Sequence, residues 1–236
     1  MIRLNKYLAS LGVASRRKID SLIEGNKISV NGYLAKVGMQ IDPDKDEVKV
    51  NGKPVKSETH LEYFILNKQK GIVSTASDNH GRATVVSKVK SSVRLFPVGR
   101  LDIESEGLII LTNDGELANR LTHPKFHIPK IYEVRIVGRV SEKQLERLNR
   151  GIVIEEGKKA EAEVTKIANE NNATLLKFVL HQGYNHQIRK MTSRVGLEII
   201  MLRRVAIGEI KLGDLKKGES RALTPAEVAS LTEFVA

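Results

Sequence analysis

The sequence predicts an α+β protein in which a small part with two helices and short strands precedes a larger sheet domain. Apolar residues recur at helical spacing near the amino terminus, and strand-sized apolar runs then mix with short helices. No regular βαβ rhythm appears and no glycine-rich phosphate loop follows a strand, which argues against a Rossmann or P-loop fold. With 236 residues, 41% of them hydrophobic, the chain can bury a core in each part.

Two helices are predicted at the amino terminus. The first runs from 3 to 11 and ends at Gly12, and the second begins after the N-cap Ser15 and ends at Gly25. Their apolar stripes consist of Leu4, Leu8 and Leu11 in the first helix and Ile19, Leu22 and Ile23 in the second.

Short strands follow the helices, at 28–30, at 48–50 and around Val55. Asn31-Gly32 and Asn51-Gly52 lie next to them, and Asn-Gly beside alternating residues is a strong hairpin signal. Residues 53–62 are polar and aperiodic, so we place a linker there. The sequence therefore predicts one domain over 1–60 and a second over 61–236.

Strands and helices of the second domain are predicted from their periodicity. The strands are 63–66, 93–96, 108–111, 132–137, 175–180 and 199–202, and the helices are 116–121, 142–148 and 187–195. Asn113-Asp114-Gly115 precedes one helix, so we interpret its polar side chains as a structural cap.

Basic residues outnumber acidic ones, with 39 Lys and Arg against 28 Asp and Glu and a net charge of +11. This excess favours a polyanionic partner such as nucleic acid, although a merely soluble, positive surface is the alternative. Arg16, Arg17 and Lys18 crowd the first turn of the second helix, where the helix dipole disfavours cations unless they meet an anion. A solvated charged turn and a mitochondrial transit peptide are the other interpretations of this basic segment.

Several classes of protein are excluded or disfavoured by composition. Cysteine is absent, which rules out disulfides and thiolate sites and fits a reducing cytoplasm. No apolar run has the length of a membrane-spanning helix. The histidines are spaced too irregularly for a metal site, so we expect neither a metal nor a membrane role.

The amino-terminal segment resembles the small alpha-L RNA-binding domain, which also occurs in a small-subunit ribosomal protein and in some aminoacyl-tRNA synthetases. The matching segments are residues 3–8, 14–17 and 30–32. The resemblance implies that five cations face RNA phosphates: Arg3, Lys6, Arg16, Arg17 and Lys18.

Asp102 follows Gly99-Arg100-Leu101 in a loop, where an aspartate on its own is most often a turn or cap residue. The wider set of motifs resembles the RsuA/RluB/RluE/RluF family of pseudouridine synthases. The matching segments are 66–71, 99–102, 105, 107–108, 111–115, 130–134 and 183–191. Gln69 departs from this pattern, because the family usually has proline there.

The resemblance implies an isomerase that converts a uridine of ribosomal RNA to pseudouridine without a cofactor. It implies a mixed, largely antiparallel sheet in the catalytic domain, a monomeric enzyme, and a large-subunit stem-loop near the peptidyl transferase centre as substrate. Asp102 would be catalytic, Tyr132 would stack on the target base, and Arg189 would be the basic residue of the third motif. The alternatives are a synthase for small-subunit RNA and a non-catalytic ribosome-assembly factor.

The chemistry requires an ionised carboxylate, which either attacks the anomeric carbon or removes a proton from the neighbouring ribose carbon. A cation beside it would keep it charged, and Arg189 is the candidate, with a phosphate contact as its alternative role. Tyr132 is equally well explained as an inward-facing strand residue. Further candidates for RNA contacts are Arg100, Lys130, His186, Lys190 and Arg194.

Overall fold

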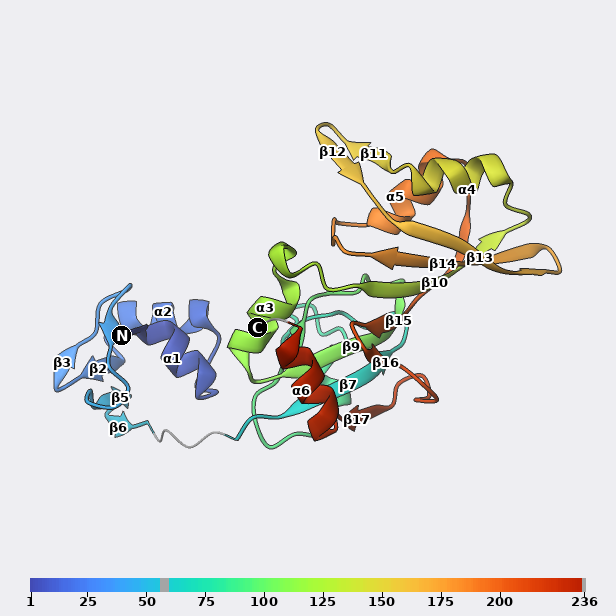
Figure 1. Cartoon of the computed structure of the whole chain (residues 1–236). Helices are drawn as coiled ribbons and strands as arrows, with labels where there is room; N and C mark the ends of the chain where they lie inside the picture. Colours follow the sequence, from blue (N-terminus) through green and yellow to red (C-terminus); the bar gives the residue numbers. More distant parts are fainter. Residues whose placement is uncertain (56–59, 235–236) are drawn as a thin grey trace. The chain divides into compact units, whose positions relative to one another are not determined.

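The computed structural model describes residues 1–55 and 60–234, and the chain divides into two compact units. The first unit holds residues 1–62 with 91–94 and 113–115, and the second holds the other residues. Both units contain helices and sheet, which confirms the α+β class (Figure 1). The predicted domain boundary at residue 60 follows residues 56–59, which lie outside the described residues.

Two helices begin the first unit, α1 (Leu4–Ser10) and α2 (Arg16–Glu24), as predicted. Ser15 caps α2, because its hydroxyl accepts a hydrogen bond from the backbone N–H of Lys18 at 3.3 Å. Gly12 follows α1 with φ +77°, a conformation that favours glycine. Four residues of the predicted stripes are fully buried in the core of this unit: Leu4, Leu8, Ile19 and Ile23.

Short strands complete the first unit in two small sheets. β1 (Ile2–Arg3) pairs with β4 (Gln40–Ile41), and a four-stranded sheet has the order β3-β2-β5-β6, with β2 Ile28–Val30, β3 Tyr33–Leu34, β5 Val48–Val50 and β6 Lys53–Pro54. Both Asn-Gly hairpin turns are confirmed, with positive φ at Asn31, Gly32, Asn51 and Gly52.

The predicted linker, 53–62, is wrong at its start. Lys53 and Pro54 form β6, and the backbone N–H of Val55 donates to the carbonyl of Val48 at 3.0 Å. Lys53 and Pro54 are exposed in an edge strand, where proline is tolerated. Part of the remainder, residues 56–59, lies outside the described residues.

One large sheet organises the second unit, with the strand order β13-β14-β10-β15-β9-β7-β17 and with β16 and β8 at its side. The strands are β7 Tyr63–Lys68, β8 Phe96–Val98, β9 Glu106–Thr112, β10 Lys130–Val137, β13 Glu163–Glu170, β14 Ala173–Leu180, β15 Ile199–Ile207, β16 Ile210–Lys211 and β17 Ser220–Ala222. Among the described strands of this sheet, β15 and β9 pair in parallel and the others pair antiparallel, which confirms the mixed, largely antiparallel sheet.

Helices cover the two halves of this sheet and create two cores (Figure 1). α4 (Glu142–Asn149), α5 (Gln187–Arg194) and the hairpin of β11 (Ile152–Glu155) and β12 (Lys158–Ala160) contribute to the core around β10, β13 and β14. α3 (Gly115–Thr122) and α6 (Pro225–Glu233) contribute to the core around β7, β8 and β9. Short 3₁₀ turns lie at Val86–Lys88 and Pro124–Phe126.

The strand predicted at 93–96 is displaced, because β8 begins only at Phe96. The backbone N–H of Val93 donates to the hydroxyl of Ser91 at 3.1 Å, which belongs to a turn and not to a sheet ladder. The strands β11, β12, β13, β16 and β17 and the helix α6 had no counterpart in the prediction.

Candidate active site

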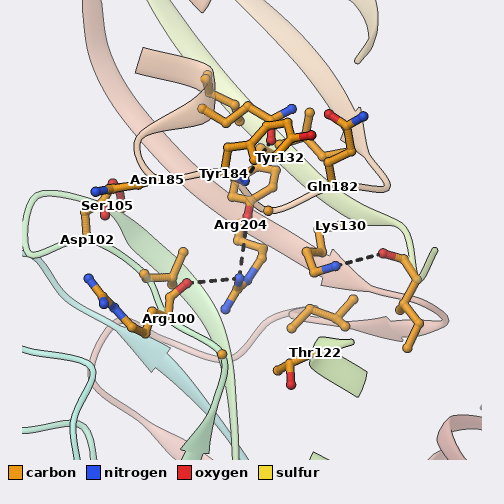
Figure 2. Close-up of a pocket in the computed structure, with 18 of the residues that line it drawn as sticks. Arg100, Asp102, Ser105, Thr122, Lys130, Tyr132, Gln182, Tyr184, Asn185 and Arg204 are labelled. Carbon is orange, nitrogen blue, oxygen red and sulfur yellow. Dashed lines mark hydrogen bonds between the residues drawn. The ribbon is translucent and has the colours of Figure 1, made fainter. Parts of the chain in front are cut away.

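A cavity of about 440 Å³ in the second unit brings together the three residues predicted to be catalytic, Asp102, Tyr132 and Arg189. They come from the loop before β9, from β10 and from α5 respectively. Figure 2 shows Asp102 and Lys130 on different sides of this cavity, with Tyr132 and Arg204 between them. A second cavity of about 870 Å³ shares residues 100–102, His186 and Arg189 with the first.

The backbone around Asp102 is held on both sides of the residue. The hydroxyl of Ser74 donates to the carbonyl of Leu101 at 2.7 Å and accepts from the N–H of Leu101 at 3.1 Å. The N–H of Ser105 donates to the carbonyl of Asp102 at 3.0 Å. The carboxylate itself stays accessible, with 27% of the side chain exposed, so a substrate can reach it.

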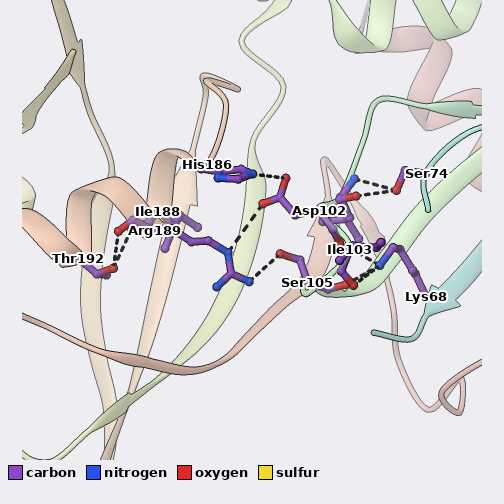
Figure 3. Close-up of polar contacts among 10 residues, drawn as sticks. Lys68, Ser74, Asp102, Ile103, Ser105, His186, Ile188, Arg189 and Thr192 are labelled. Carbon is purple, nitrogen blue, oxygen red and sulfur yellow. Dashed lines mark hydrogen bonds and ion pairs between the residues drawn. The ribbon is translucent and has the colours of Figure 1, made fainter. Parts of the chain in front are cut away.

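Lys68, the last residue of β7, is fully buried and binds the backbone of the same loop. Its ammonium donates to the carbonyls of Asp102, Ser105 and Gln69 at 3.0, 2.8 and 3.0 Å, and to a fourth carbonyl, that of Ile103, at 3.3 Å (Figure 3). Burial lowers the pKa of Lys68 to about 8, although the nearby acids Asp102, Glu104 and Glu106 oppose this shift. A buried lysine with carbonyl partners therefore defines the shape of the Asp102 loop.

Arg189 and His186, both from the start of α5, contact the carboxylate of Asp102 (Figure 3). Nε of Arg189 lies 3.8 Å from one oxygen, and Nε2 of His186 lies 3.4 Å from the other. Nη2 of Arg189 also donates to the hydroxyl of Ser105 at 3.4 Å. Arg189 thus contacts both the carboxylate of Asp102 and the hydroxyl of Ser105.

Tyr132 pairs across the strands with Arg204 of β15. The guanidinium carbon of Arg204 lies 6.0 Å from the centre of the tyrosine ring, and Nη1 donates to the hydroxyl of Tyr132 at 3.5 Å. Nε of Arg204 donates to the carbonyl of Leu108 at 2.7 Å, and Nη1 also reaches the carbonyl of Arg100 at 3.4 Å. Arg204 is only 3% exposed, so it supports the ring from the interior of the sheet.

The other predicted RNA contacts of this unit differ in their surroundings. Arg100, Lys130 and His186 line the cavity. Lys190 forms an ion pair with Glu155, which makes it less available to a phosphate than the sequence suggested. Arg194 is exposed at the end of α5.

In the first unit, the five cations predicted to contact RNA are all exposed, and within the described residues none of them forms an ion pair. They are Arg3, Lys6, Arg16, Arg17 and Lys18. Arg16, Arg17 and Lys18 form the first turn of α2, as predicted, so their charges repel the dipole of their own helix.

Among the described residues no group of three or more His, Asp and Glu side chains is arranged to hold a metal ion. None of the helices described is long and apolar enough to span a membrane. Asn113 has a structural role, as predicted, and its side chain binds the backbone near residue 60. The side-chain oxygen of Asn113 accepts a hydrogen bond from the N–H of Glu62 at 2.8 Å, and its side-chain nitrogen donates to the carbonyl of His60 at 2.9 Å.

Sequence reasoning missed Lys68 and Arg204, because buried basic side chains contradict the ordinary pattern of strands. The signal for Lys68 was its place in the segment 66–71, directly after the apolar end of a strand. Arg204 had no comparable signal, because Arg203-Arg204 resembles the polar end of the predicted strand 199–202.

Comparison with known proteins agrees with this geometry. Residues 62–194 match the family described as RNA pseudouridylate synthase, and residues 2–47 match the S4 domain. A crystal structure titled pseudouridylate synthase superposes with a TM-score of 0.70 and 27% identity, covering 98% of this chain and 100% of the other.

Two curated relatives extend over almost the whole chain. An uncharacterized RNA pseudouridine synthase of Aquifex aeolicus is 40% identical, over 99% of this chain and 95% of the relative. The ribosomal large subunit pseudouridine synthase B of Bacillus subtilis is also 40% identical, over 98% of this chain and 96% of the relative.

The fold, the cavity and these matches define an RNA-modifying isomerase. The chain belongs to the RNA pseudouridylate synthase family and, with its amino-terminal S4 domain, to the RsuA/RluB group within it.

Proposed function

We propose that this enzyme isomerises a uridine of large-subunit ribosomal RNA to pseudouridine, with Asp102 as the catalytic residue. The substrate is supported by the names of two relatives, from Bacillus subtilis and from Pseudomonas aeruginosa, each called ribosomal large subunit pseudouridine synthase B. The second of these is 34% identical over 99% of this chain.

One observation carries the assignment of Asp102: its carboxylate lies in a cavity with a cation and an aromatic ring. Nε of Arg189 lies 3.8 Å from a carboxylate oxygen of Asp102, and Tyr132 lines the same cavity. The cation can pair with the charged carboxylate that the reaction requires, and the ring offers a face to an unstacked base. Since these residues come from distant segments, their convergence is specific to the folded chain.

The reaction breaks the bond between C1′ of the ribose and N1 of uracil and makes a new bond between C1′ and C5. Asp102 either attacks C1′ or removes a proton from C2′, and each route requires its charged form. Arg189 and His186 orient the carboxylate, and Lys68 fixes the loop that carries it. The target nucleotide must leave its stack to reach Asp102, and Tyr132 replaces part of that stacking.

The decisive experiment is Asp102→Asn, which keeps the shape of the side chain and removes its charge. We expect the variant to bind the RNA as the wild type does and to form no pseudouridine, as measured by chemical mapping of ribosomal RNA incubated with each protein. Asp214→Asn is the matched control, because Asp214 is exposed and outside the cavity. Normal modification by Asp102→Asn would overturn the assignment.

The same mapping tests the substrate. We expect the new pseudouridine in large-subunit RNA, and a product found only in small-subunit RNA would replace that part of the proposal. We also propose that the enzyme acts as a monomer, because Asp102, Tyr132 and Arg189 of one chain meet in one cavity. We also propose that it acts in the cytoplasm, together with the bacterial ribosomal RNA for which its relative in Bacillus subtilis is named.

A further inference from the structure

Two basic side chains in the cavity, Lys130 and Arg204, lack a carboxylate partner among the described residues. Two acids of the same region already have partners: Asp102 pairs with Arg189 and His186, and Glu106 pairs with Lys217 at 2.7 Å. Keeping two partly or fully buried cations without a counter-charge costs stability, so the site holds positive charge that the fold itself does not neutralise.

Both cations also have unused hydrogen-bond donors. Among the described residues the ammonium of Lys130 donates to the carbonyl of Ile128, at 3.0 Å, and an ammonium has three donors. Nη2 of Arg204 is buried and has no hydrogen-bond partner within the same described part of the chain. The orphaned donor belongs to a residue that is almost fully buried and lines the cavity, and buried donors of this kind are normally satisfied by protein, by ordered water or by a ligand.

The position of these cations relative to Asp102 indicates which part of a nucleotide they would meet. Asp102 must contact the ribose, since the reaction occurs at C1′ or C2′. Lys130 lies on another side of the cavity, and Arg204 lies beside Tyr132, the residue that stacks on the base (Figure 2). With the ribose at Asp102 and the base on the ring of Tyr132, the base lies beside Arg204, in the cavity that Lys130 also lines.

We propose that Lys130 and Arg204 form an anion site for the detached uracil, donating hydrogen bonds to its carbonyl oxygens during the reaction. When the bond between C1′ and N1 breaks, its electron pair stays on the base, and the negative charge spreads over N1, O2 and O4. The base then turns, C5 bonds to C1′, the proton on C5 is lost and N1 gains one, so the product is an isomer of the substrate.

This inference rests on the proposed function: Asp102 acts on the ribose, and Lys130 and Arg204 act on the base. The base is neutral before the bond breaks and anionic afterwards, so fixed cations stabilise the transition state more than the bound substrate. Lys130 and Arg204 are held by backbone carbonyls before the substrate arrives, so little reorganisation is needed when the charge develops.

The test compares two substrates that differ in how well the base leaves. The RNA fragment that the wild-type enzyme modifies is prepared with uridine or with 5-fluorouridine at the target position, and loss of the target nucleoside is measured under single-turnover conditions. 5-Fluorouracil forms a more stable anion than uracil. We expect Lys130→Met to slow the reaction of uridine about 100-fold and that of 5-fluorouridine no more than about 10-fold.

The controls distinguish stabilisation of the uracil anion by Lys130 from binding of a phosphate. Lys130→Arg should recover part of the rate, because it restores the charge, and Lys177→Met, which removes an exposed lysine outside the cavity, should behave like the wild type. Equal defects of Lys130→Met on both substrates would overturn the proposal. Weaker RNA binding with a shallower salt dependence and an unchanged rate would also overturn it and assign Lys130 to a phosphate.

Failure of the proposed function would look different, since the wild type would then form no pseudouridine when ribosomal RNA is mapped, before any fragment is chosen. Arg204→Met is a second variant with the same expected substrate dependence. Because Arg204 is buried and could be needed for folding, its circular dichroism spectrum is compared with that of the wild type first, and Lys130→Met keeps the proposal testable on its own.

Discussion

Gly107 of β9 lies so close to Arg204 of β15 that a Cβ atom on Gly107 would stand 2.1 Å from the carbonyl oxygen of Arg204. The two residues are direct neighbours in the parallel pair of the sheet. Tyr132 is the neighbour of Arg204 on its other side. The absence of a side chain at Gly107 therefore lets the backbone of Arg204 approach, and this sets the place of its guanidinium under Tyr132.

We expect Gly107→Ala to destabilise the protein by about 3 kcal/mol or more, measured by urea unfolding. Its φ of +103° strains any residue with a Cβ, and the clash is with backbone, which cannot move aside cheaply. Gly138→Ala is the control, since Gly138 has φ +73° but nothing within 4 Å. It should cost only about 1 kcal/mol. Similar losses in both variants would show that the close contact is unimportant.

We expect the reaction rate to fall as the pH rises above about 8. Above that pH Lys68 loses a proton, and its hydrogen bonds to the carbonyls of the Asp102 loop weaken. Burial and Arg204 lower the pKa of Lys68, whereas Asp102, Glu104 and Glu106 raise it. The unfolded chain binds the proton more tightly than the folded one between about 8 and 10.5, so this residue's contribution to stability increases with pH in that window. Activity should therefore fall while circular dichroism shows a folded protein.

The variant Lys68→Met identifies the group responsible for this pH dependence. It should be slow already at neutral pH and lack the fall near pH 8 at which Lys68 loses its proton in the wild type. Burial also lowers the pKa of Lys130, so the profile of Lys130→Met is needed as well, and it should keep the fall. If the decline disappeared in Lys130→Met and persisted in Lys68→Met, the assignment to Lys68 would be wrong.

We expect Arg189→Met to reduce the single-turnover rate about 100-fold, with RNA affinity almost unchanged, because Asp102 loses its nearest arginine. Arg189→Lys should lose only about 10-fold, because it keeps the charge but cannot bridge Asp102 and Ser105 together. Ser105→Ala, which removes only the weaker contact, serves as the control. A loss of affinity at an unchanged rate would mean that Arg189 binds a phosphate.

We expect Arg16→Ala combined with Arg17→Ala to weaken RNA binding and to reduce the slope of log affinity against log salt by about one for each phosphate that the variant no longer binds. The reason is that these exposed side chains have no ion pair within the described residues. The double variant Lys36→Ala with Lys53→Ala removes the same charge from exposed positions elsewhere in the first unit. An unchanged slope in the arginine variant would remove α2 from the RNA interface.

Elements with a strong local signal could be predicted from the sequence. The stripe of Ile188, Met191 and Val195 indicated α5, and all three residues are buried. The continuous apolar run of 108–111 indicated β9, a strand that is buried along its whole length. The Asn-Gly turns were correct because few other conformations suit that pair.

Other elements depend on tertiary contacts that leave little trace in sequence. β13 lies at the edge of the sheet, and Val164 is its one fully buried residue, so its apolar pattern is weak. Arg204 faces the interior because Tyr132 and the carbonyl of Leu108 receive its guanidinium, and both partners are far away along the chain. The grouping of Asp102, Tyr132 and Arg189 came from resemblance to a family, since no local pattern specifies such a distant meeting.

The pairing of β17 with β7 has a consequence for synthesis on the ribosome. β7 is the first strand of the second unit, and its partner at one edge, β17, is among the last segments to be translated. β15, which carries Arg204, also emerges long after the strand β9 that it joins. Such non-local pairings delay folding until the late strands exist. A nascent chain from which β15 has not yet emerged lacks Arg204 and therefore cannot form the complete cavity, and a truncated product that ends before Ser220 lacks the edge strand that pairs with β7.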